Sequence, residues 1–213
     1  RLRSWDAPEA GDRRRTLLVF AKAPRPGTVK TRLAADVGDA EAVRIYRTLG
    51  RGVVDAVRAG PWRTVVWFAP ADARHEMEGW LGAEEVAFRP QARRGLGRRM
   101  AEAFREAFRE GTDAACIVGT DAPGVDGALV DRAFAALGEL DEVLGPAEDG
   151  GYYLLALDRP RPELFRDVPW STSRVLSRTR ERIRELGLTE HLLPTLRDVD
   201  RLPDVPPHLL RKD

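Results

Sequence analysis

Four cations gather in the loop that follows the first apolar run of the chain. Residues 17–21 (LLVFA) have the length and the apolar content of a buried strand. The loop after them contains one glycine, two prolines and the cations Lys22, Arg25, Lys30 and Arg32. Ligands of open α/β sheets bind at the carboxyl ends of the strands, so this loop is placed to bind an anion. We expect a phosphate group there; the alternative is that the same cations only solvate a surface loop.

Residues 27–31 (GTVKT) match part of the phosphate-binding P-loop pattern, G-x-x-x-x-G-K-[ST]. When Lys30 is aligned with the lysine of that pattern, Pro24 and Val29 occupy the two glycine positions. The tight cradle of backbone amides needs those glycines. The sequence therefore excludes a P-loop NTPase, while the charge and position of the loop still favour phosphate binding.

Two carboxylates follow predicted strands. Asp121 comes directly after the apolar residues 114–118, in a Gly-Thr-Asp-Ala-Pro turn, and Asp149 belongs to a Glu-Asp-Gly-Gly turn after residues 142–146. Each turn alone is also explained by ordinary turn chemistry. If the two strands are close neighbours, however, both carboxylates face the cationic loop and could hold a divalent cation that bridges phosphate oxygens.

The segment Pro169-Trp170-Ser171-Thr172 carries weaker signals. Ser171 lacks the G-x-S-x-G elbow of a hydrolase nucleophile. Ser171 and Thr172 are first of all candidates to cap the helix that follows. Trp170 could form the wall of a substrate pocket, although core packing is the more common role of a tryptophan.

The composition indicates one globular domain. The 213 residues are 43% hydrophobic, and 35 Lys and Arg against 34 Asp and Glu give a net charge of +1. This balance is unlike the overall basicity of a nucleic-acid-binding protein, and no apolar run approaches the about 18 residues of a membrane span. The single Cys116 cannot form an internal disulfide, which favours a reducing cytoplasm. We expect residues 1–15 to be a flexible lead-in and residues 16–213 to form one cytoplasmic domain.

Strands and helices alternate along the chain. Apolar runs predict strands at 17–21, 64–69, 85–88, 114–118, 142–146 and 152–157. Helical spacing predicts helices that begin at Asp39, near residue 73, near residue 96 and at Asp126, and a last helix that ends at Gly187. This alternation is typical of a three-layer α/β/α sandwich with a mostly parallel, mixed sheet. The residues after Gly187 are expected to be a short appendix.

Together these motifs resemble a bacterial glycosyltransferase-like family of the nucleotide-diphospho-sugar transferase superfamily. The resemblance is carried by FAKAPRPGTVKTRL, GTDAPGV, GPAEDGGYYLLAL, PWSTSRVLSRT and LRDVD, in this order between about residues 16 and 205. The chain is similar, more distantly, to guanylyltransferases that act on phospholactate or molybdopterin. The resemblance implies a GT-A-like, Rossmann-like fold that binds an activated nucleotide and a small-molecule acceptor.

The resemblance also implies roles for individual residues. The implied phosphate-facing residues are Lys22, Gly27, Lys30 and Arg32, and the implied ligands of Mg²⁺ or Mn²⁺ are Asp121, in place of the superfamily's Asp-x-Asp element, and Asp149. Lys30, Asp121 and Asp149 are thus the expected catalytic residues. The acceptor or sugar side is expected near Gly150, Gly151, Trp170, Ser171 and Thr172.

One segment departs from the family pattern. Members commonly carry Gln-Gly followed by Gly-Asp-Leu-Gly, where this chain reads Gln91-Ala92-Arg93-Arg94-Gly95-Leu96-Gly97. Gln91 and Gly97 are expected on the nucleotide side of the site, and the changes between them put contacts to the base or ribose in question.

The expected function is metal-dependent transfer from a nucleoside diphosphate sugar. Two alternatives stay open. One is nucleotidyl transfer from an NTP with release of pyrophosphate, and the other is nucleotide binding without catalysis, which only the altered segment 91–97 favours.

Overall fold

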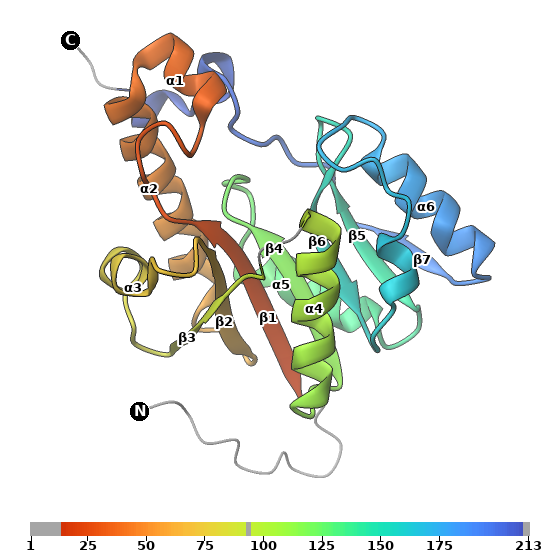
Figure 1. Ribbon diagram of the computed structural model, residues 1–213. Helices are drawn as coiled ribbons and strands as arrows, with labels where there is room; N and C mark the ends of the chain where they lie inside the picture. Colours follow the sequence, from red (N-terminus) through yellow and green to blue (C-terminus); the bar gives the residue numbers. More distant parts are fainter. Residues whose placement is uncertain (1–13, 93–94, 211–213) are drawn as a thin grey trace.

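The computed structural model describes residues 14–92 and 95–210, so most of the expected lead-in lies outside the described residues. Its centre is a seven-stranded sheet with the strand order β3-β2-β1-β4-β6-β5-β7 (Figure 1). The strands are β1 (Arg15–Lys22), β2 (Arg63–Ala69), β3 (Val86–Pro90), β4 (Ala114–Gly119), β5 (Glu142–Pro146), β6 (Tyr152–Leu157) and β7 (Glu190–Leu192). Only β6 runs antiparallel to its two neighbours, while the other pairs of this sheet are parallel. The prediction of a mostly parallel, mixed sheet is confirmed.

Helices cover both faces of this sheet. The helices are α1 (Thr31–Val37), α2 (Asp39–Val57), α3 (Arg74–Leu81), α4 (Leu96–Arg109), α5 (Gly127–Ala136) and α6 (Val175–Glu185), with 3-10 turns η1 (Pro162–Phe165), η2 (Leu202–Asp204) and η3 (Pro207–Leu209). Successive residues of a strand point to opposite faces. Accordingly, Leu17 and Val19 pack in one core with α2, α3 and α5, and Leu18 packs in a second core with α4, η1 and α6. The three-layer α/β/α sandwich is therefore also confirmed, and no helix of the described part is long and apolar enough to cross a membrane.

The predicted helix caps are partly right. Asp126 caps α5, because its carboxylate accepts a hydrogen bond from the Leu129 N–H at 2.8 Å. Asp39 does not cap α2: the cap position is Gly38, with φ 82°, because α1 ends there and the chain turns directly into α2. Nor do Ser171 and Thr172 cap α6, which begins after Arg174. The Thr172 hydroxyl donates to the Pro169 carbonyl at 2.7 Å and so stabilises the turn before the helix instead.

The prediction of a terminal appendix is wrong. Strand β7 extends the sheet by pairing with β5, and residues 193–210, called here the C-terminal segment, then return along the carboxyl edge of the sheet to α1 and α2 (Figure 1). Val199 and Val205 are buried there against Leu33 and Ile45. The sequence did not reveal this path because the contacts that bury Val199 and Val205 are with Leu33 and Ile45, which are distant in sequence.

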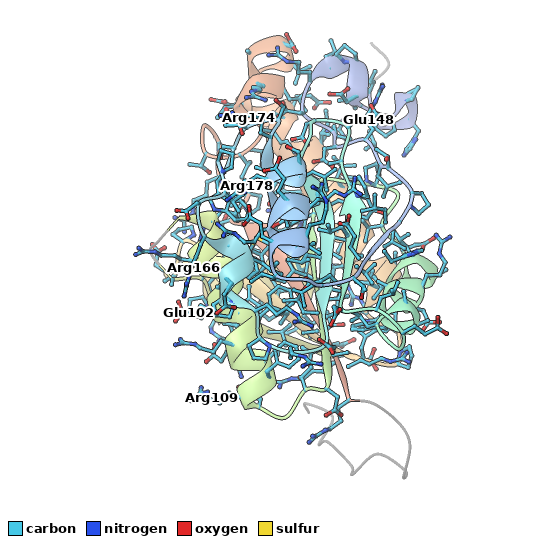
Figure 2. The ribbon with its side chains drawn as sticks, turned by 90° about the vertical axis from the view of Figure 1, so that its right-hand side faces the viewer. Glu102, Arg109, Glu148, Arg166, Arg174 and Arg178 are labelled. Carbon is cyan, nitrogen blue, oxygen red and sulfur yellow. The ribbon has the colours of Figure 1, made fainter. Side chains whose placement is uncertain are left out.

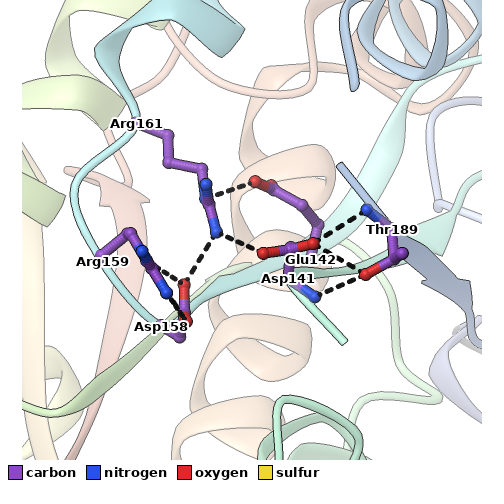
Figure 3. A network of polar contacts seen from close by, with 6 residues as sticks. All are labelled: Asp141, Glu142, Asp158, Arg159, Arg161 and Thr189. Atoms are coloured by element: carbon purple, nitrogen blue, oxygen red, sulfur yellow. Dashed lines mark hydrogen bonds and ion pairs between the residues drawn. The ribbon is translucent and has the colours of Figure 1, made fainter. Parts of the chain in front are cut away.

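A network of charged residues closes the opposite, amino edge of β5 (Figure 3). Glu142 is fully buried, with its Oε1 2.8 Å from the Arg161 Nε. Arg161 also contacts Asp141 at 2.9 Å and Asp158 at 3.0 Å. Burial raises the pKa of Glu142 to about 8, and the neighbouring carboxylates add to this, although Arg161 acts in the opposite direction. This network joins β5 to the turn after β6 and lies away from the edge where a ligand is expected.

Glu142 is expected to make the stability of the protein depend on pH. Since its folded-state pKa of about 8 exceeds the ordinary value of 4.5, the folded protein keeps a proton that the unfolded chain releases between these values. The contribution of Glu142 to stability is therefore complete below about pH 4.5 and decreases as the pH rises to about 8. As the pH rises through this window, the unfolding free energy of Glu142→Gln, measured by urea denaturation, should increase relative to that of the unmodified protein. The increase should be at most about 1.4 kcal/mol per pH unit. The control is Glu139→Gln at an exposed position, for which the difference in unfolding free energy from the unmodified protein should not change with pH. A difference that is also independent of pH for Glu142→Gln would contradict the raised pKa of Glu142.

Candidate functional site

Loops from distant parts of the chain form a cavity at the carboxyl edge of the sheet. Its volume is about 410 Å³. The lining residues are Lys30, Arg32, Asp121, Glu148, Asp149, Arg197, Asp198, Asp200, Arg201 and Asp204. They come from the loop after β1, the first turn of α1, the loop after β4, the turn between β5 and β6, and the C-terminal segment. The strand order reverses between β1 and β4, which is the kind of place where α/β sheets bind ligands.

Lys30 is held deep in this cavity. It has a left-handed backbone conformation, φ 49°, immediately before α1, and its side chain is only 6% exposed. The Nζ donates to the Val199 carbonyl at 2.5 Å and lies 2.9 Å from the Oδ1 of Asp121. The structure thus brings together two of the three expected catalytic residues, Lys30 and Asp121. Arg32 is more exposed and pairs with Asp200 of the C-terminal segment at 2.7 Å.

Asp121 and Asp149 both line the cavity. Asp121 follows β4 and is fixed through its backbone, because its carbonyl accepts from the Val199 N–H at 3.0 Å. Its side chain is 47% exposed. Asp149 accepts a hydrogen bond from the Gly151 N–H at 2.8 Å, so it also fulfils the turn role that was the alternative for it.

A third carboxylate of the cavity, Asp198, has no role predicted from the sequence. Its Oδ1 is buried and has no hydrogen-bond partner among the described residues. Burial, with the charges of Asp121 and Asp149, raises the pKa of Asp198 to about 6, and Lys30 counteracts this rise. A buried carboxylate oxygen without a partner is costly, and a cation is the partner that would satisfy it.

The carboxylates of the cavity have the ligand atoms that a hard divalent cation prefers, but they are not spaced as ligands of one ion. Asp121, Asp149 and Asp198 supply oxygen atoms alone, which Mg²⁺ and Mn²⁺ prefer. Within residues 14–92 and 95–210, however, no three His, Cys, Asp or Glu side chains are grouped closely enough to hold a metal. The nearest charge to the Asp121 carboxylate that the structure shows is the ammonium of Lys30, 2.9 Å from its Oδ1.

Other expected nucleotide-side residues do not line the cavity. Lys22 is exposed at the end of β1, and Gly27 forms the turn of the cationic loop with φ 72°. Gln91 is buried: its Nε2 donates to the Trp67 carbonyl at 2.7 Å, and its Oε1 accepts from Arg99 at 2.7 Å. The side-chain amide of Gln91 therefore links the residue that follows β3 to β2 and α4 through hydrogen bonds.

Gly97 has a packing role. A Cβ at this position of α4 would lie 2.5 Å from the Nε1 of Trp170. Trp170 in turn stacks on Phe165, with ring centroids 6.4 Å apart. The indole thus belongs to the contact between α4 and η1, which is the core-packing alternative for this tryptophan. Arg93 and Arg94 lie outside the described residues.

The residues expected on the acceptor side lie around the turn that carries Asp149. Gly150 has φ 87°, and its carbonyl accepts from the Leu176 N–H at 2.9 Å, which attaches the turn to the start of α6. Ser171 and Thr172 are exposed just before that helix, and neither they nor Gly150 and Gly151 line the cavity. Figure 2 shows Glu148 of this turn and Arg174 at the same end of the molecule, opposite Arg109 at the end of α4.

The C-terminal segment supplies half of the residues that line the cavity. The sequence did not predict this contribution. Arg197 pairs with Glu148 at 2.7 Å, and Asp204 accepts from the Arg201 N–H at 2.9 Å. The available signal was the LRDVD motif, in which one aspartate stands on each side of a valine. This pattern predicts acidic side chains that are held in place by a buried apolar residue. In the sequence it carried only the family resemblance.

Comparisons with known proteins support the resemblance. Residues 53–172 match the family described as "Uncharacterized protein conserved in bacteria (DUF2064)". The chain belongs to this family. A solved structure from Desulfovibrio desulfuricans G20, described as a "putative nucleotide-diphospho-sugar transferase", is 33% identical, with 89% of this chain and 84% of that chain covered and a TM-score of 0.84. The search of curated proteins found no match.

More distant structures share the fold. A nucleotidyl transferase from Methanothermobacter thermautotrophicus is 17% identical, with 91% of this chain and 94% of that chain covered and a TM-score of 0.59. Glucosyl-3-phosphoglycerate synthase from Mycobacterium tuberculosis, in a complex with Mn²⁺ and UDP, is 14% identical, with 92% and 75% covered and a TM-score of 0.54. The chain therefore shares its fold with nucleotide-diphospho-sugar transferases and nucleotidyltransferases.

Proposed function

We propose that the protein is a metal-dependent glycosyltransferase that transfers a sugar from a nucleoside diphosphate to a small-molecule acceptor. The observation that carries this proposal is the cavity between β1 and β4. It is lined by Lys30, which pairs with Asp121, and by Asp198, whose buried Oδ1 has no hydrogen-bond partner among the described residues. The relative from Desulfovibrio desulfuricans supports the same class of donor.

The charges of the cavity favour a metal cofactor. Its six carboxylates outnumber its four cations by two, so a diphosphate would meet net repulsion unless a divalent cation enters with it. Asp121, Asp149 and Asp198 offer oxygen ligands in this cavity, and one or two of these carboxylates would be enough to hold Mg²⁺ or Mn²⁺. When bound, the ion would neutralise charge on the diphosphate leaving group.

Lys30 and Arg32 would bind the diphosphate. Lys30 would exchange its contact with Asp121 for a phosphate oxygen, and its burial makes such a charge interaction stronger than it would be in water. The acceptor would approach from the turn at Gly150 and Gly151, next to Ser171 and Thr172. The oxygen of the acceptor hydroxyl would then bond to the anomeric carbon as the bond from that carbon to the diphosphate breaks. The nucleoside diphosphate would leave, and the hydroxyl proton would pass to solvent.

The second candidate function is nucleotidyl transfer. The same Lys30 could stabilise the α-phosphate of an NTP, and the fold is shared with the nucleotidyl transferase from Methanothermobacter. In this reaction an oxygen of the acceptor attacks the α-phosphate, and pyrophosphate leaves.

A thermal-shift screen should show a rise in melting temperature that requires both a nucleotide and Mg²⁺ or Mn²⁺. A ligand present at 100 times its dissociation constant stabilises the folded state by about 2.7 kcal/mol, which is easily detected. The nucleotides that stabilise the protein are then incubated with candidate acceptors. Release of nucleoside diphosphate supports glycosyl transfer, and release of pyrophosphate supports nucleotidyl transfer. Binding without either product would indicate a non-catalytic nucleotide-binding protein, and a shift that persists in EDTA would contradict the metal requirement.

A further inference from the structure

One buried hydroxyl group joins the two loops that carry Lys30 and Asp121. It belongs to Tyr46 of α2, which is 4% exposed. Its oxygen lies 3.0 Å from the Lys22 nitrogen, 3.2 Å from the Lys22 carbonyl oxygen and 3.4 Å from the Thr120 Oγ1. A phenolic hydroxyl donates one hydrogen bond and accepts two. Its capacity is used completely when the Lys22 N–H and the Thr120 hydroxyl donate to it and it donates to the Lys22 carbonyl.

These hydrogen bonds begin where the pairing of β1 with β4 ends. The last pair in that register is Phe20 with Gly119. Thr120 is the next residue after this pair on one strand, and Lys22 follows two residues after it on the other. The Tyr46 hydroxyl therefore takes the place of a neighbouring strand at the point where the sheet order reverses and the cavity opens.

The position of the hydroxyl is itself fixed by packing. The Tyr46 ring lies against Trp80, with centroids 5.3 Å apart. Trp80 fits closely over Gly50 of α2, where a Cβ would be 2.6 Å from the indole. Burial, together with the charge of Asp121, raises the pKa of Tyr46, so the hydroxyl keeps its proton at neutral pH. Its three hydrogen bonds are consequently present under the conditions in which a transferase would work.

We propose that Tyr46 is a positioning residue, which sets the distance between the cationic loop and the Asp121 carboxylate through Lys22 and Thr120. The inference rests on the proposed function, because it assigns to these two loops the binding of one diphosphate and its metal. Without the hydroxyl, the N–H and the carbonyl of Lys22 lose a buried partner at the last residue of β1, directly before the loop that leads to Lys30. The two loops would then no longer be held in one relative position, and a ligand that contacts both would bind more weakly.

The test compares Tyr46→Phe with Tyr152→Phe. Both changes remove one buried hydroxyl and keep the ring, but Tyr152 packs in the core on the other face of the sheet, and its hydroxyl does not line the cavity. The probes are Mn²⁺, followed by the electron paramagnetic resonance of the free ion, and inorganic pyrophosphate in the presence of Mn²⁺. Pyrophosphate represents the diphosphate without requiring the base to be known. We expect Tyr46→Phe to raise the dissociation constant of pyrophosphate about tenfold, the effect of one buried hydrogen bond, and Tyr152→Phe to change it less than about twofold.

Hydrogen exchange of the protein alone separates this proposal from the proposed function. Tyr46→Phe should increase amide exchange in residues 22–30 and 119–122, and Tyr152→Phe should not. If Tyr46→Phe exchanges faster but binds pyrophosphate as tightly as the control, the hydroxyl is only structural and the proposal is overturned. If the unmodified protein binds neither Mn²⁺ nor pyrophosphate, the proposed function fails, and unchanged exchange in the two loops would overturn the role of Tyr46 as well.

Discussion

Asp121→Asn is expected to abolish transferase activity while the fold stays intact. Asparagine has the same shape as aspartate and can still accept the hydrogen bond of Lys30, but it lacks the negative charge that a divalent cation requires. Loss of a group outside the ligand set already costs 10–100-fold in metal affinity, so loss of a ligand should weaken Mn²⁺ binding by about 100-fold or more. Activity should fall by at least about 10³, because the charge on the leaving diphosphate is no longer neutralised.

Two further variants make this result specific. Asp131→Asn changes an exposed aspartate of α5 that pairs with Arg15 of β1, and both metal affinity and activity should stay unchanged. Lys30→Met should have the opposite effect on metal affinity: Mn²⁺ should bind more tightly because the ammonium no longer pairs with Asp121. Pyrophosphate, in contrast, should bind more weakly to Lys30→Met. Full activity in Asp121→Asn, with metal binding preserved, would remove Asp121 from the proposed mechanism.

Gly150→Ala is expected to destabilise the protein severely. Gly150 has φ 87°, and a Cβ there would overlap the carbonyl group of Ser173, at 2.7 Å from its carbon and 2.8 Å from the Ser173 Cα. The overlapping atoms belong to the backbone and cannot rotate away. The turn would have to separate from the start of α6 and lose the hydrogen bond between the Leu176 N–H and the Gly150 carbonyl. We expect the unfolding free energy to fall by about 3 kcal/mol or more, in the range of severe single substitutions.

The matched control for this substitution is Gly187→Ala. Gly187 has a similar φ of 68°, but a Cβ there has no heavy atom within 4 Å. It should therefore lose only the conformational term of about 1–2 kcal/mol. Urea denaturation of both variants separates the clash from the backbone strain, and equal losses of stability would show that the close contact with Ser173 relaxes without cost.

Local patterns were enough to predict most of the architecture. The apolar run of β1 and the spacing of α4 each identify an element by themselves, because burial of one face requires a period of two or of 3.6 residues. The Asp126 cap was predictable for the same reason: the carboxylate and the Leu129 N–H that it binds are three positions apart. Where local signals competed, as at Asp39, the direction from which the chain enters the helix decided the outcome.

The sequence by itself determined the layered α/β fold, the cationic loop that contains Lys30 and the two turns that carry Asp121 and Asp149. Only the tertiary structure decided that the Lys30 ammonium pairs with Asp121 and donates a hydrogen bond to the carbonyl of Val199, 169 positions away in the sequence. It also decided that the side-chain amide of Gln91 is hydrogen-bonded within the scaffold and that Asp198 lines the same cavity as Asp121 and Asp149. The physical reason is that periodicity and turn chemistry act between near neighbours in sequence. Charge and hydrogen bonding within the cavity, by contrast, depend on which strands pair and on where the C-terminal segment crosses them.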